Sequence, residues 1–171
     1  MARAFVSVGS NIEPEIHVRQ ALALIAVRTH LAAISTVYLT DPLGRPEQDP
    51  YYNCVLEIAT DLPPLEVKRT LLQAIENKLG RVRRQDKYAP RTIDLDLIVY
   101  GDLILDEDGL KLPDPEIMKR PFLALPLAEL APGWVLAGSN RRIEEVAAAL
   151  SADRMRPLAD YARQLRQELL P

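Results

Sequence analysis

The spacing of apolar and polar positions changes several times along the chain, and each spacing predicts an element. Residues 3–8 form an apolar run that ends at a Gly-Ser-Asn turn, which predicts a strand. Residues 14–29 carry apolar side chains at helical spacing and predict a helix. Residues 34–40 are rich in β-branched and aromatic side chains, and residues 52–60 alternate with Cys54, Leu56 and Ile58 on one side. Both segments predict strands.

A second helix and strand follow. Residues 63–80 begin with two prolines, carry an apolar stripe and end at a glycine suited to a left-handed cap, so they predict a helix. Residues 93–99 alternate and predict a half-buried strand. The order βαββαβ is typical of an α+β, ferredoxin-like core, an antiparallel sheet with helices packed on one face. Helical patterns near residues 142–150 and 158–170 predict extra C-terminal helices.

Composition excludes several classes of protein. The 171 residues are 48% hydrophobic and carry a net charge of -3, which is ordinary for a globular domain and argues against nonspecific nucleic-acid binding. The chain has neither a GxGxxG nor a GxxxxGK[ST] motif, so a bound phosphate would be held mainly by side chains. One cysteine and two histidines exclude a Cys/His zinc site. The longest apolar run spans only residues 21–27 and no signal peptide is evident, so we expect a cytoplasmic protein without a membrane segment.

Two carboxylates lie in the last predicted strand. Asp94 and Asp96 are two positions apart, so they leave the same face with Cα atoms roughly 6.6 Å apart. Divalent cations that also bind phosphate oxygens and water would suit such a pair. A bare D-x-D is equally typical of the solvated face of an edge strand.

A basic segment precedes this strand. Residues 81–91 contain five cations and one anion, a net charge of +4. Guanidinium groups bind phosphate oxygens in a forked geometry, so this segment and the two aspartates together predict a site for a polyphosphate and metal ions. A solvated loop or a nucleic-acid patch would show the same run of charge.

The same segments resemble a known family. Gly-Arg-Val-Arg-Arg at residues 80–84 and Tyr-Ala-Pro-Arg-Thr-Ile-Asp-Leu-Asp at residues 88–96 are similar to the signature of the 6-hydroxymethyl-7,8-dihydropterin pyrophosphokinases of folate biosynthesis. Agreement extends to Val-Gly-Ser-Asn at residues 8–11, Thr-Asp-Pro-Leu-Gly at 40–44, Tyr-Tyr-Asn at 51–53 and Arg-Pro-Phe-Leu-Ala-Leu-Pro-Leu at 120–127. The resemblance implies transfer of the diphosphoryl group of ATP to the hydroxymethyl oxygen of the pterin, with AMP leaving.

The resemblance also implies residue roles. Two magnesium ions would bind Asp94 and Asp96, with Arg81 and Arg91 as further catalytic residues that stabilise charge. The residues implied for ATP, the co-substrate, are Gln73, Glu76, Arg81, Arg83, Tyr88, Arg91 and Arg120. Those implied for the pterin are Thr40, Pro42, Leu43, Tyr51, Asn53 and Phe122. For Glu76, a surface ion pair with a neighbouring cation is the alternative.

We therefore expect a single pyrophosphokinase domain over residues 1–171, with a core at about 3–135 and a helical extension at about 140–171. Its ligands would be small molecules, with no nucleic acid, membrane or obligatory protein partner. The loops at residues 41–50 and 81–90 would act as lids that close when ATP binds and exclude water.

Two positions depart from the family pattern. Asp114 replaces a histidine that would contact phosphate, and Tyr88 replaces a tryptophan. A carboxylate repels phosphate, so Asp114 would act through metal or water or would point away, and Asp114→His is predicted to tighten ATP binding. His17 and His30 are interpreted as surface or satisfied core residues, and Cys54 as a small hydrophobic residue of the core.

Three other functions share parts of the pattern. RNA-recognition domains have the same element order, but residues 52–57 do not match their RNP1 motif. A regulatory ligand-binding module would have no use for a D-x-D preceded by five cations. A two-metal nuclease would explain the aspartates but not the segment at residues 40–53.

Overall fold

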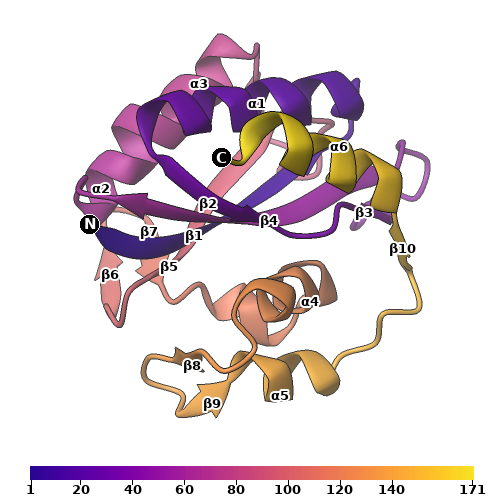
Figure 1. The fold of residues 1–171 in the computed structure, drawn as a ribbon. Helices are drawn as coiled ribbons and strands as arrows, with labels where there is room; N and C mark the ends of the chain where they lie inside the picture. Colours follow the sequence, from indigo (N-terminus) through magenta and orange to yellow (C-terminus); the bar gives the residue numbers. More distant parts are fainter.

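A computed structural model describes all 171 residues, and it is built on one antiparallel sheet (Figure 1). The strands of this six-stranded sheet are β1 (Ala2–Ser10), β2 (His30–Ile34), β3 (Tyr38–Thr40), β4 (Tyr51–Thr60), β5 (Asp94–Tyr100) and β10 (Met155–Pro157). Their order is β10-β3-β4-β1-β5, and β2 also pairs with β4. β1 lies between β4 and β5, which are the third and fourth strands that the sequence predicted. This position of the first strand confirms the ferredoxin-like arrangement.

Helices and two small hairpins complete the chain. The helices are α1 (Pro14–Arg28), α2 (Pro64–Glu66), the π-helix η1 (Val67–Leu72), α3 (Gln73–Lys78), the 3-10 helix η2 (Pro115–Met118), α4 (Pro121–Leu130), α5 (Ile143–Ala148) and α6 (Ala159–Leu169). The hairpins pair β6 (Leu105–Glu107) with β7 (Leu110–Leu112), and β8 (Val135–Leu136) with β9 (Arg141–Arg142). None of these helices is long and apolar enough to span a membrane.

Helices cover both faces of the sheet: the helices of the predicted core lie together on one face, as expected, and later helices add a layer on the other. The helices α1, α3 and α6 lie on one side, and α4 and α5 lie on the other (Figure 1). Neighbouring residues of β1 show why: Phe5 and Val6 are both fully buried, and they belong to separate apolar clusters. Such a strand needs cover on two faces. The second layer comes from the part of the chain after residue 101, whose helical pattern did not indicate a face.

The predicted strand at residues 34–40 is interrupted. β2 begins earlier, at His30, and ends at Ile34, whereas β3 starts at Tyr38. Ser35, which is fully buried, makes the bend: its N–H donates to the Val55 carbonyl at 3.0 Å, and its hydroxyl accepts the Val55 N–H at 2.9 Å. The Ser35 hydroxyl accepts a hydrogen bond that a backbone carbonyl would accept in a regular strand. Strand propensity does not predict where a side chain takes over this role.

The helix predicted at residues 63–80 is confirmed as a continuous helical segment, but its middle turn is π-helical. Gly80 has φ 77°, which confirms the left-handed cap. In β5 the predicted alternation ends at a bulge opposite Phe5 and Val6. Val99 therefore packs beside Ile98 in the second cluster rather than with Leu97 in the first.

Candidate active site

Two adjoining clefts lie where β1 ends and β5 begins. The first cleft has a volume of about 440 Å³ and is lined by residues from β1, β4, β5, α4 and the two loops predicted as lids. The second cleft has a volume of about 420 Å³ and lies between η1, α3, β5 and the β6–β7 hairpin. Asp94, Asp96 and Asp114 line both clefts. We call this shared boundary the junction.

Strand register brings the two aspartates to the junction. In β5, Asp94 lies opposite Gly9 and Asp96 lies opposite Ser7 of β1. Gly9 allows a close approach: a Cβ at this position would lie 3.0 Å from Oδ1 of Asn53. A larger residue would therefore displace Asn53 from the first cleft.

A buried carboxylate orders the basic segment behind the junction. Glu76 is only 2% exposed and accepts hydrogen bonds from Arg81, from Arg83 at 2.7 Å and from the Leu95 N–H at 2.9 Å. Burial raises the pKa of Glu76, opposed by the Leu95 N–H and the charge of Arg81. The alternative of a surface ion pair is wrong, because Glu76 lies inside and is fully partnered.

Two arginines pair with Asp94. Arg81 donates to Oδ1 of Asp94 at 2.6 Å, and Arg91 donates to Oδ2. Arg91 is itself anchored, since its backbone N–H donates to Oδ1 of the buried Asn11 at 2.8 Å. Both guanidinium groups are thus held at the junction by fixed partners.

Asp96 has no ion-pair partner among these cations. Its side chain is exposed in the clefts, and the reduced hydration there together with the charges of Asp94 and Glu76 raises its pKa. A set of neighbouring carboxylates with an excess of negative charge suits a bound cation. No group of three or more acidic, histidine or cysteine side chains converges as a metal site, so two aspartates would need phosphate oxygens and water to complete a coordination shell.

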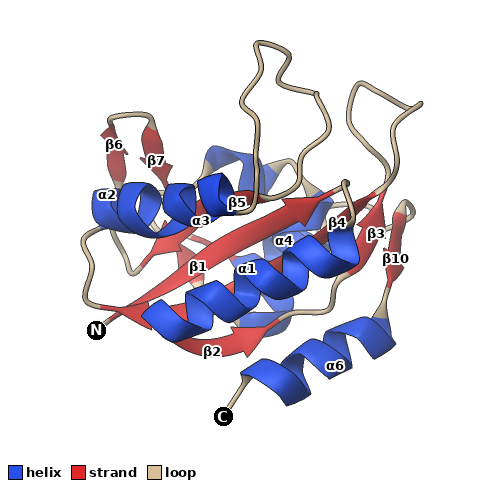
Figure 2. Ribbon diagram, turned by 90° about the horizontal axis from the view of Figure 1, so that it is seen from above, coloured by secondary structure: helices blue, strands red, loops and turns tan.

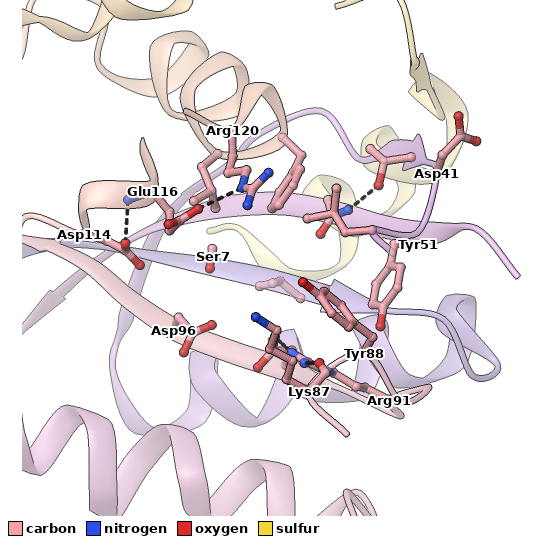
Figure 3. Close-up of a pocket in the computed structure, with 18 of the residues that line it drawn as sticks. Ser7, Asp41, Tyr51, Lys87, Tyr88, Arg91, Asp96, Asp114, Glu116 and Arg120 are labelled. Carbon is pink, nitrogen blue, oxygen red and sulfur yellow. Dashed lines mark hydrogen bonds and ion pairs between the residues drawn. The ribbon is translucent and has the colours of Figure 1, made fainter. Parts of the chain in front are cut away.

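Asp114 does not point away from the junction. One of its oxygens accepts the Glu116 N–H at 2.9 Å and caps η2, and its side chain lines both clefts. Burial raises the pKa of Asp114, and the Glu116 N–H opposes this. Figure 3 shows Asp114, Glu116 and Arg120 across the first cleft from Lys87, Tyr88 and Arg91.

The wall of the first cleft near β3 contains most of the residues implied for the pterin. Those that line it are Thr40, Leu43, Tyr51, Asn53 and Phe122, whereas Pro42 lines neither of the two clefts. Nδ2 of Asn53 donates to Oγ1 of Thr40 at 2.6 Å. This bond fixes the amide orientation, and its oxygen stays available to a ligand.

The residues implied for ATP are divided between the clefts. Gln73, Glu76, Arg81 and Arg83 line the second cleft, whereas Tyr88, Arg91 and Arg120 line the first. The sequence analysis missed Lys68 and Lys111 in the second cleft, and Ser7, Gln48, Lys87 and Glu116 in the first.

Lys68 holds the turn of the β6–β7 hairpin. Its ammonium donates to the carbonyls of Asp108 at 3.3 Å and Gly109 at 2.7 Å. Asp108 and Gly109 both have positive φ, as a two-residue type I′ turn requires. The Asp-Gly pair between short alternating runs could have revealed this hairpin from the sequence, but no sequence signal marks Lys68.

The two loops predicted as lids touch each other. Arg45 of the first loop forms an ion pair with Asp86 of the second. Gln48 donates to the Tyr88 carbonyl at 2.6 Å and accepts from Nδ2 of Asn11 at 3.2 Å. Figure 2 shows both loops rising from the same side of the sheet. Their contacts are made by exposed side chains, in contrast to those of Glu76.

Known proteins place this geometry in a family. A model of the 7,8-dihydro-6-hydroxymethylpterin-pyrophosphokinase (HPPK) family matches residues 5–132. The chain belongs to the HPPK family. It is therefore a pyrophosphokinase of folate biosynthesis, which confirms the resemblance and replaces the RNA-binding, regulatory and nuclease alternatives.

Sequence relatives agree with HPPK membership, and a solved structure agrees with the fold. The 2-amino-4-hydroxy-6-hydroxymethyldihydropteridine pyrophosphokinase of Synechocystis is 39% identical over 160 residues, which cover 91% of this chain and 80% of the relative. The enzyme of the same name from Pseudomonas aeruginosa is 39% identical over 150 residues, covering 86% and 91%. A Plasmodium falciparum HPPK-DHPS structure has a TM-score of 0.64 at 13% identity, covering 92% of this chain and 47% of that one, so it shows the fold alone.

Proposed function

We propose that the enzyme transfers the diphosphoryl group of ATP to the hydroxymethyl oxygen of 6-hydroxymethyl-7,8-dihydropterin in a magnesium-dependent reaction. One observation carries the proposal: two separate clefts meet at Asp94 and Asp96. A two-substrate transfer needs two pockets that converge where the bond is exchanged. The ligands are small molecules, and the reaction needs no other macromolecule.

ATP would occupy the second cleft with its phosphates at the junction. Arg81 and Arg83 are held there by Glu76, and Leu95, Leu97 and Leu110 provide apolar wall for a base. The pterin would occupy the first cleft, between Tyr51 and Phe122, with the Asn53 amide at its polar edge. In this arrangement the hydroxymethyl oxygen approaches the phosphates from the opposite side of the junction.

The residues at the junction fit magnesium. Asp96 and Asp94 would hold it, because both carboxylates leave the same face of β5 and line both clefts, and oxygen is the donor that magnesium prefers. Bound magnesium would neutralise phosphate charge and make the β-phosphorus more electrophilic. The bond that forms joins the hydroxymethyl oxygen of the pterin to the β-phosphorus, and the bond from that phosphorus to the oxygen bridging the α-phosphate breaks. AMP leaves with the bridging oxygen, and the hydroxyl proton goes to solvent water.

The arginines would stabilise the charge that develops during transfer. Arg81 and Arg91 already lie beside Asp94, and Arg120 lies across the first cleft, paired with Glu116 at 2.8 Å. Fixed guanidinium groups need little reorganisation when negative charge moves to the leaving oxygen. The loops at residues 41–50 and 81–90 would close over both substrates and exclude water.

The test is release of AMP from ATP in the presence of the hydroxymethyl-dihydropterin, with magnesium, without magnesium and without pterin. We expect AMP only when all three components are present. AMP formation without pterin would indicate hydrolysis instead of transfer. Binding of ATP without any AMP formation would mean that the acceptor is a different molecule.

A further inference from the structure

The C-terminal segment completes the main sheet next to the first cleft. It lies outside the part of the chain that the family model matches, residues 5–132. β10 pairs antiparallel with β3, with Met155 opposite Thr40 and Pro157 opposite Tyr38. The Leu158 N–H extends this pairing and donates to the Val37 carbonyl at 2.7 Å. β10 is the last strand at this side of the sheet, so β3 has a partner on each side (Figure 2).

β3 needs this second partner because it is short and ends at a long loop. It contains three residues, and its last, Thr40, lies opposite Tyr51 of β4. The loop at residues 41–50 connects these two residues, so the pair is the base of the loop, and both side chains line the first cleft. A three-residue edge strand has few ladder hydrogen bonds and opens easily. Pairing with β10 restrains it from the other side.

The helix α6 restrains the other strand at the same base. The ring of Tyr161 packs edge-to-face against Tyr52, with the ring centroids 5.6 Å apart. The hydroxyl of Tyr161 donates to the Glu15 carbonyl at 2.6 Å. Nε of Arg166 donates to the Ile34 carbonyl at 2.8 Å, directly before the bend that leads to β3. The segment therefore contacts the strand that enters the loop and the strand that leaves it.

We propose that β10 and α6 together form a positioning element for the acceptor cleft. They hold the base of the loop at residues 41–50, so that Thr40 and Tyr51 keep the placement that a pterin would need. This inference rests on the proposed function, because it assigns the pterin to the first cleft. The second cleft is lined by η1, α3, β5 and the β6–β7 hairpin, none of which pairs with β10. The element should therefore act on the acceptor and leave the nucleotide unaffected.

The test compares two substitutions at one position. Arg156 is exposed and lies opposite Leu39 in the ladder. Arg156→Pro removes the backbone N–H of a paired residue, whereas Arg156→Ala removes only the exposed side chain.

In the free protein, amide hydrogen exchange at residues 38–44 should rise in the proline variant alone. With a nonhydrolysable ATP analogue bound, the Kd of the hydroxymethyl-dihydropterin should increase about fivefold in that variant, the equivalent of one lost hydrogen bond. The Kd of the analogue itself should not change.

A second pair of variants covers the case in which Arg156→Pro does not fold. Arg166→Met keeps the side-chain stem but removes the bond to Ile34, and Arg163→Met is its control on an exposed position of the same helix. We expect weaker pterin binding for Arg166→Met only. Equal changes in both Kd values, or no change in either, would overturn the inference. If the unmodified protein bound no pterin, the proposed function would fail, and unchanged exchange at residues 38–44 would still overturn the positioning role independently.

Discussion

The two clefts are built in different ways. The second cleft is organised by Glu76, which is 2% exposed and joins Arg81, Arg83 and the β5 backbone. The first cleft is bordered by loops whose contacts, such as Arg45 with Asp86, are between exposed side chains. A buried network is rigid before ligand arrives, whereas exposed contacts are weak and exchange with water. In the proposed arrangement the nucleotide end would thus be prepared in advance, and the acceptor end would depend on loop closure.

The largest expected effect is at the junction, which belongs to both clefts. Asp96→Asn removes one charge without changing the shape of the side chain, so folding and the binding of the pterin should be nearly preserved, whereas magnesium should bind more weakly. Because magnesium would lose one of its two carboxylate ligands, the developing phosphate charge would be less well neutralised, and turnover should fall on the order of 100- to 1,000-fold. AMP release, together with thermal denaturation, measures this. Normal turnover would show that Asp96 lies on a solvated strand face without a catalytic role.

Glu76→Gln tests the second cleft, which the buried network around Glu76 organises. An amide cannot balance the two arginines, so removal of this buried charge should lower the free energy of unfolding by about 3 kcal/mol. Misplaced arginines should also reduce kcat between about 10- and 100-fold, with a smaller effect on the KM of the pterin. Glu66→Gln, at an exposed position early in the same helical segment, is the matched control. A loss of pterin affinity equal to the loss of kcat would contradict the separation of the two ends.

Substitution of the Arg45–Asp86 ion pair tests the first cleft, which the two loops border. Each partner replaced by alanine, singly and together, gives a double-mutant cycle for the contact between the loops. The pair is exposed, so we expect a coupling energy of at most about 1 kcal/mol, seen as a two- to fivefold rise in the KM of the pterin with unchanged protein stability. Strictly additive effects would mean that the two loops close independently.

Asp114→His should have the smallest effect. The histidine removes a negative charge from the junction, so ATP binding should tighten, but it also loses the cap on the Glu116 N–H. These contributions oppose each other, and we expect a net gain in ATP affinity of about two- to threefold. Calorimetry with a nonhydrolysable analogue measures it. An unchanged or weaker Kd would show that Asp114 serves the junction in another way.

Short-range patterns predicted much of the fold. The alternation in residues 93–99 placed Asp94 and Asp96 on one face, and the proline pair and glycine bounded the helical segment correctly. The pattern of apolar residues did not predict the interruption at Ser35, where a side chain replaces a backbone hydrogen-bond partner. It also did not predict the π-helical turn or the bulge in β5, each of which changes the spacing of buried residues. The hairpin turn at Asp108 and Gly109 could have been predicted from the sequence, but the hydrogen bond from Lys68 to this turn could not.

The sequence by itself determined the order of the core elements, the basic segment and the aspartate pair, because each depends on neighbours a few residues apart. The tertiary structure alone decided that Glu76 is buried against Leu95, that Asn11 anchors Arg91, and that the C-terminal strand pairs beside Thr40. These contacts join residues distant along the chain, and the burial of a charge or the partner of a short strand depends on which surfaces meet when the layers pack.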